Sequence, residues 1–166
     1  MRSVLFDHHR EVVRPEWIDD NDHMNMGYYV VAFDLATDAW LTYVGLSEAE
    51  RASRRVTTFS LESHVTYVRE VFEGDALRFT TRLLGFDKKR IHYFHEMFHE
   101  GEGYLAATNE LMSLHVSQDT RRAATMAPEL LDRLSAVLQE HASLPTPAQV
   151  GRRLGMDQRP LRGRGR

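Results

Sequence analysis

The chain has 166 residues, a net charge of -3 at pH 7 and a pI near 6.3. This length is enough for one domain with a substantial core, and the mildly acidic balance argues against nucleic-acid or membrane-surface partners. Because cysteine is absent, a disulfide framework and a thiolate nucleophile are excluded. No apolar run has the length of a signal peptide or a membrane span, so we expect a cytoplasmic protein.

The first predicted elements are a short strand, a polar loop and a long helix. Residues 9–14 have the composition of a strand, which ends at Pro15 because proline cannot donate to a ladder. Residues 27–44 are apolar on nearly every side, so the helix that they predict is mostly buried. Gly45 ends this helix, and residues 47–55 form a polar connection with room for one helical turn.

The middle of the chain predicts strands separated by turns. Apolar and polar residues alternate over 59–67 at the period of a strand. Four apolar residues of this segment are expected to pack on the helix: Phe59, Leu61, Val65 and Tyr67. Further strands are predicted at 77–84, 91–99 and 104–116, with turns at 73–75, 85–90 and 100–103. The economical architecture is an α+β fold in which a bent antiparallel sheet wraps one long helix.

The C-terminal part divides into a helix and a tail. Residues 128–141 carry leucines and a valine on one face, which predicts an amphipathic helix. Beyond it, proline, glycine and arginine dominate, and such a composition cannot build a core. We therefore predict a folded domain of residues 1–142 and a flexible tail of residues 143–166.

The polar loop before the long helix is the strongest candidate site. Within residues 19–25 lie three carboxylates, one imidazole and two carboxamides. The first amides of the helix that follows are unpaired and carry the positive end of its dipole. An anion could therefore be bound beside a base. The alternative is that these Asp and Asn side chains only cap the helix.

The spacing of four residues in this loop resembles a known family. Asp19, His23, Asn25 and Tyr29 match the opening loop of hot-dog-fold acyl-CoA thioesterases of the 4-hydroxybenzoyl-CoA type, although Asp22 stands where many members have glycine. Asn-Met-Gly-Tyr-Tyr-Val-Val-Ala-Phe-Asp at 25–34, together with the sequences at 59–67 and 95–99, resembles the betainyl-CoA thioesterase branch, which is associated with carnitine breakdown. The resemblance covers about residues 7–140.

This resemblance implies a hot-dog fold that hydrolyses acyl-CoA thioesters without a metal or an organic cofactor, coenzyme A being part of the substrate. It places the thioester carbonyl at the backbone amide near Met26. Asp19 then serves either as a general base or as a nucleophile, and Asp20 is its rival. His23 and Asn25 orient and polarise the substrate; His23 could instead cap the helix or pair with a neighbouring Asp.

Other residues are candidates for holding the substrate. Lys88, Lys89 and Arg90 lie together on a predicted turn and could bind the phosphates of CoA, or could simply be a solubilising surface. A trimethylammonium group is held by aromatic faces and a carboxylate. The aromatic candidates are Trp17, Tyr28, Tyr29, Phe59 and Tyr67, of which Phe59 and Tyr67 could equally be core residues.

Two glutamates complete this set of candidates. Glu110 shares its strand register with mostly apolar residues, so we expect it to point inward. Glu62 falls on the polar face of its strand, which meets solvent or another subunit. A single bent sheet also leaves an edge open and the helix partly uncovered, which predicts a homodimer or a higher homo-oligomer with active sites between subunits.

Residues 95–99 match the zinc-peptidase signature H-E-x-x-H, with His95, Glu96 and His99 in the diagnostic positions. That motif requires a helix, because on a strand two residues four apart are separated by about 13 Å and cannot share one tetrahedral zinc. We expect a strand here and therefore no metal site. A zinc hydrolase remains one alternative function; a hot-dog module that binds acyl-CoA or a protein without catalysis is the other.

Overall fold

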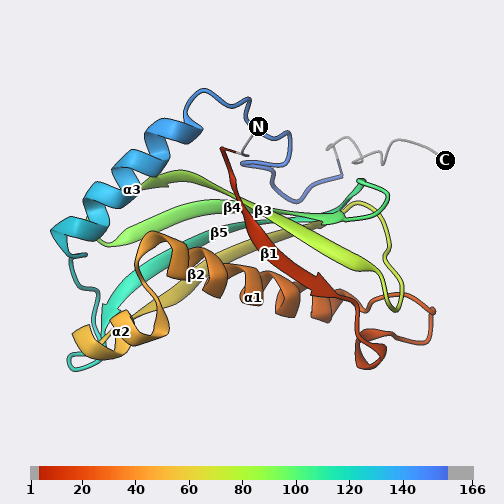
Figure 1. The fold of residues 1–166 in the computed structure, drawn as a ribbon, viewed down its shortest axis with the longest axis horizontal. Helices are drawn as coiled ribbons and strands as arrows, with labels where there is room; N and C mark the ends of the chain where they lie inside the picture. Colours follow the sequence, from red (N-terminus) through yellow and green to blue (C-terminus); the bar gives the residue numbers. More distant parts are fainter. Residues whose placement is uncertain (1–3, 157–166) are drawn as a thin grey trace.

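The computed structural model describes residues 4–156 and shows an antiparallel sheet with a long helix, α1 (Met26–Val44), along one face (Figure 1). The strands are β1 (Phe6–Val12), β2 (Val56–Tyr67), β3 (Ala76–Phe86), β4 (Arg90–His99) and β5 (Leu105–Ser117). They are ordered β1-β3-β4-β5-β2. The 3-10 helix η1 (Pro15–Trp17), α2 (Glu48–Arg54) and α3 (Pro128–His141) complete the fold. The predicted sheet around a central helix is confirmed.

The two ends of helix α1 are set by capping residues, Asn25 before its first turn and Gly45 after its last. The side chain of Asn25 accepts a hydrogen bond from the Gly27 amide at 2.9 Å and so caps the first turn. At the other end Gly45 has φ +99°, a left-handed conformation that glycine adopts without steric cost. The buried face of the helix carries small residues such as Ala32 and Ala36, which let it lie close to the sheet.

The core has two clusters along α1. The cluster near the helix N-terminus contains Phe33 and Phe79, and the cluster near its C-terminus contains Trp40, Tyr93 and residues of α3. His95 lies on the same sheet face and is fully buried. It is therefore a structural part of the interior, held by hydrogen bonds to neighbouring side chains.

The hydrogen bonds of His95 define its tautomer. Thr37 on α1 donates its hydroxyl hydrogen to the Phe33 carbonyl, so its oxygen accepts from Nε2 of His95 at 3.0 Å. Nδ1 then accepts from the hydroxyl of Thr81 on β3 at 2.8 Å. Burial lowers the pKa of His95 to about 3, so the ring is neutral at pH 7. The neutral imidazole joins helix to sheet with both nitrogens satisfied.

The H-E-x-x-H segment forms part of β4, which confirms the predicted strand. His99 bonds the Glu102 amide at 3.0 Å and lies 3.4 Å from Asp75, so it shares no partner with His95. Among residues 4–156 no group of three or more His, Cys, Asp or Glu side chains is placed to hold a metal ion.

The expectation that β2 packs on the helix is right for one end of the strand only. Val65 packs against the N-terminal cluster, and the Tyr67 hydroxyl donates to the Met26 carbonyl at 3.2 Å. Phe59 and Leu61 are instead 63% and 46% exposed. Strand β2 is the edge of the sheet, so the helix of one chain leaves this part of it uncovered.

The first part of the predicted tail lies against the sheet face opposite α1, called the outer face below. Arg82 and Glu110 both flank Phe94 in the ladder, so the three side chains share this face. Arg82 donates to the Pro145 carbonyl at 2.7 Å, and Glu110 accepts from the Gly151 amide at 2.7 Å. This segment covers Phe94, which is 1% exposed.

Residues 157–166 lie outside the described part of the chain, and the domain boundary at residue 142 stays a prediction. No helix within residues 4–156 is both long enough and apolar enough to cross a membrane.

Candidate active site

The loop before α1 folds into a small closed turn. The Asp19 amide donates to the His23 carbonyl at 3.2 Å, and the Asp22 amide donates to the Asp19 carbonyl at 3.0 Å. Asp22 has φ +63°, in the left-handed region that glycine occupies most easily. Aspartate is among the few other residues that visit this region readily. The turn can therefore form with Asp22 in place of glycine.

Asp19 is held as a carboxylate by two donors. Its Oδ1 accepts from the Asn21 amide at 2.9 Å and its Oδ2 accepts from Nδ2 of Asn25 at 3.1 Å. The hydrogen bond from the Asn21 backbone, aided by Asn25, holds the pKa of Asp19 below its ordinary value. Asp19 is thus ionised at pH 7. The side chain of its rival, Asp20, is exposed to solvent.

The first backbone amides of α1 differ in whether they have a hydrogen-bond partner. The Gly27 amide is taken by the side chain of Asn25, and the Tyr28 amide donates to the Asn25 carbonyl at 3.0 Å. The Met26 amide has no hydrogen-bond partner in the part of the chain that the structure describes. A free donor at a helix N-terminus therefore follows directly after Asn25, the residue that holds the Asp19 carboxylate.

His23 is half-buried, and its partners differ from those considered in the sequence. Its Nδ1 lies 3.4 Å from the Met24 carbonyl. Its Nε2 lies 4.0 Å from Oε2 of Glu70, which follows β2. The neighbouring carboxylate is thus that of Glu70 rather than that of Asp20 or Asp22.

Two of the aromatic candidates, Tyr29 and Tyr67, line a cavity, whereas Trp17 and Tyr28 do not. Trp17 is 3% exposed, stacks on Tyr28 with ring centroids 5.8 Å apart, and has the Arg14 guanidinium 4.9 Å from its ring centre. Trp17 does not line the cavity beside Met26, and its contact with an acyl group stays a prediction. Tyr29 and Tyr67 meet edge to face at 5.2 Å and line a cavity of about 290 Å³ beside Met26.

Comparisons with known proteins show the family to which this chain belongs. The family model of the thioesterase-like superfamily matches residues 13–134. The chain belongs to that superfamily.

Two relatives in the thioesterase-like superfamily are similar over most of this chain. A betainyl-CoA thioesterase of Pseudomonas aeruginosa is 38% identical over 94% of this chain and 98% of its own. An L-carnitine dehydrogenase/betainyl-CoA thioesterase of Agrobacterium fabrum is 38% identical over 86% of this chain, which spans 29% of that protein.

A solved structure of a Staphylococcus aureus protein in complex with CoA has a TM-score of 0.86 and 31% identity, covering 94% of this chain and 98% of that one. A DHNA-CoA thioesterase of the same organism, 20% identical with a TM-score of 0.73, covers 79% of this chain and 89% of its own. Because its identity to this chain is only 20%, the second structure supports the fold and not the function. The predicted hot-dog fold is confirmed.

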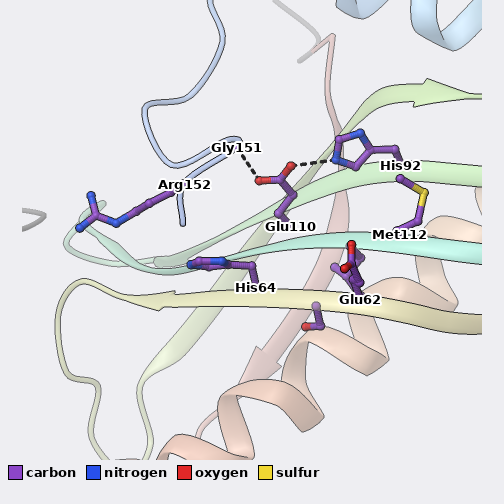
Figure 2. Close-up of a pocket in the computed structure, with 9 residues that line it drawn as sticks. Glu62, His64, His92, Glu110, Met112, Gly151 and Arg152 are labelled. Atoms are coloured by element: carbon purple, nitrogen blue, oxygen red, sulfur yellow. Dashed lines mark hydrogen bonds and ion pairs between the residues drawn. The ribbon is translucent and has the colours of Figure 1, made fainter. Parts of the chain in front are cut away.

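Glu62 and Glu110 lie apart from the Asp19 loop, on the outer face (Figure 2). Glu110 was expected to point inward, and this is wrong. Its carboxylate bonds Nε2 of His92 at 2.8 Å as well as the Gly151 amide, whereas its neighbour Leu111 packs in the core. Met112, in the same register as Glu110, also lines the outer-face cavity, together with Gly151.

Lys88, Lys89 and Arg90 lie at the β3–β4 turn, at the opposite end of β3 from the Asp19 loop. Arg90 is paired with Asp87 at 2.6 Å. The structure of one chain therefore does not bring these residues to the loop, and their contact with CoA stays a prediction.

Proposed function

We propose that this protein hydrolyses acyl-CoA thioesters at the junction between the Asp19 loop and α1. One observation carries the proposal: Asn25 uses one end of its carboxamide to cap the helix and the other to hold Asp19. The carboxylate and the unoccupied Met26 amide are thereby fixed relative to each other. A thioester carbonyl bound by that amide would present its carbon to the carboxylate.

The Met26 amide would stabilise the negative charge that develops on the carbonyl oxygen, a contribution of about 3 kcal/mol for one well-placed donor. Asp19 would either deprotonate a water molecule or attack the carbonyl carbon and release CoA as the thiolate. In the second route, water then cleaves the mixed anhydride. Hydrogen bonds lower the pKa of Asp19, which makes it a weak base but keeps it fully ionised.

We propose betainyl-CoA as the substrate, with glycine betaine and CoA as products of a step in carnitine breakdown. The names of two relatives, one of them similar over nearly the whole chain, support this choice. Free thiol release from a panel of CoA esters tests it directly, and the protein itself adds no thiol because it lacks cysteine. Binding of the esters without thiol release would instead identify a non-catalytic module.

We also propose a homodimer formed through β2. This strand is a free edge, and large apolar side chains are exposed on it and on α1: Met26, Val30, Val31, Phe59 and Leu61. Antiparallel pairing of two β2 edges would cover them. It would also carry the partner's Lys88 and Lys89 toward the Asp19 loop, because a two-fold axis brings the opposite ends of the two sheets together. An active monomer at nanomolar concentration in sedimentation and assay would rule this out.

A further inference from the structure

A cavity of about 290 Å³ adjoins the start of α1, with Met26, Tyr29, Tyr67 and Glu70 in its lining. We propose that this cavity binds the quaternary ammonium group of the acyl chain, with Glu70 supplying the counter-charge and Tyr29 and Tyr67 the ring surfaces. The proposal rests on the proposed function, because it takes the Met26 amide as the position of the thioester carbonyl. Glu70 then determines which acyl group the enzyme selects.

The position of the cavity suits the substrate. In a betainyl thioester the nitrogen is two bonds from the carbonyl carbon. The cation must therefore lie beside whatever group binds the carbonyl oxygen. Met26 provides that amide and also lines the cavity. The outer-face cavity that holds Glu62 and Glu110 is separated from this amide by the sheet, and so cannot receive the same acyl group.

The two tyrosines are held in place before any ligand binds. Their ring planes meet at 86°, so they form a corner rather than a flat surface. Tyr29 is buried, and Tyr67 is tied to the Met26 carbonyl by its hydroxyl. Burial raises the pKa of Tyr29 to about 12, so its phenol stays neutral. A quaternary ammonium cannot donate hydrogen bonds and is recognised by such ring faces and by negative charge.

Glu70 provides that negative charge. Its neighbour Arg69 also lines the cavity, but its guanidinium contacts other groups and lies 3.8 Å from the Tyr104 ring centre and 3.6 Å from Glu102. The remaining basic group is His23, whose Nε2 is 4.0 Å from Glu70. The Glu70 side chain is 57% exposed, so a cation can reach it without displacing a tight ion pair.

The test compares betainyl-CoA with 3,3-dimethylbutanoyl-CoA, in which carbon replaces the nitrogen and the shape is kept. Glu70→Gln removes the charge with little change in size. We expect the preference of kcat/KM for the cationic ester to fall by about tenfold, with the neutral ester little affected. Glu73→Gln is the matched control, because Glu73 is an exposed acidic residue three positions away that does not line the cavity, and it should keep the preference.

The ring surface is tested by Tyr67→Phe and Tyr67→Leu. Both lose the bond to the Met26 carbonyl, but only the leucine variant loses the ring. We expect the phenylalanine variant to retain the preference for the cation and the leucine variant to lose most of it. Equal loss of preference in both variants would show that the bond to Met26, not the ring, matters, and would overturn this part.

The outcomes separate the two proposals. A wild-type enzyme that hydrolyses both esters equally would overturn the cation site but leave the hydrolase intact. A wild-type preference that Glu70→Gln does not change would remove Glu70 from the site. If Glu70→Gln slows both esters equally, Glu70 acts through His23 or the fold, and the proposal is wrong. Failure of the wild type on every CoA ester would overturn the proposed function and this inference with it.

Discussion

The carboxamide of Asn25 lies 3.1 Å from the carboxylate of Asp19, measured from Nδ2 to Oδ2, while its oxygen caps α1. One side chain therefore performs two tasks that a substitution can separate. Serine is as good a helix cap as asparagine but has no donor that reaches Asp19.

We expect Asn25→Ser to keep the thermal stability close to that of the wild type and to lower kcat by about tenfold or more, because Asp19 is no longer held against the carbonyl carbon. Asn25→Ala should in addition lose about 1 kcal/mol of stability with the cap. Calorimetry and steady-state kinetics on both variants measure the two effects. If Asn25→Ser retains full activity, Asn25 is a cap and nothing more.

Asp19→Asn should lower kcat by roughly 100-fold or more, because the amide is neither a base nor a nucleophile while the shape is unchanged. Asp20→Asn is the matched control and should be close to wild type, since Asp20 is exposed on the same turn. A folded Asp19→Asn protein with normal turnover would exclude Asp19 from the chemistry.

The position of an ¹⁸O label after one turnover distinguishes direct attack by Asp19 from general-base catalysis. In a single turnover in ¹⁸O-labelled water, direct attack followed by hydrolysis at the Asp19 carbonyl leaves the label in the protein and unlabelled oxygen in the product acid. A general-base mechanism puts the label in the product acid. We expect label in the peptide that contains Asp19, measured by mass spectrometry, because Asn25 fixes this carboxylate relative to the Met26 amide, where it can attack a bound carbonyl carbon directly.

His95 should make the protein less stable in mild acid. Its pKa falls from an ordinary 6.5 to about 3 on folding, so between these values the unfolded chain binds a proton that the folded protein does not. Stability is unaffected by His95 above pH 6.5 and decreases as the pH falls below it. Between pH 7 and pH 5 the expected loss is about 2 kcal/mol.

His95→Gln keeps one donor and one acceptor but cannot titrate. Urea unfolding at pH 7 and pH 5 should therefore show a smaller loss for this variant than for the wild type. His9 and His141 also have lowered pKa values, caused first by burial, and remain in both proteins, so the difference isolates His95. The same loss in both proteins would mean that His95 carries no such penalty.

Glu110→Ala should leave kcat/KM within about twofold of the wild type, since this carboxylate lies on the outer face away from the Asp19 loop. It should instead release the segment around Gly151, whose amide it holds at 2.7 Å. Limited proteolysis of residues 143–156 is expected to be faster in the variant. A large loss of activity with unchanged proteolysis would indicate that Glu110 contacts the substrate after all.

Local patterns predicted most elements of this fold, although β1 spans Phe6–Val12 instead of the expected 9–14 and the 3-10 helix Pro15–Trp17 was not expected. Alternation over 59–67 predicted a strand, and the apolar run over 27–44 with Gly45 after it predicted α1 almost to the residue. The helix α2 is longer than the single turn expected, because Ser47 caps it by accepting from the Glu50 amide. These features are determined by neighbours in the chain, so the sequence can reveal them.

The Asp19 loop was also predictable, because its carboxylate, its capping carboxamide and the helix start are adjacent in sequence. The face on which Glu110 lies was not, because apolar alternation does not distinguish a face covered by α1 from one covered by residues 143–156. Nor could the sequence show that Glu70 lies near His23 and Tyr29. Their proximity depends on where β2 leaves the sheet relative to α1, which is determined only by the packing of the helix on the sheet.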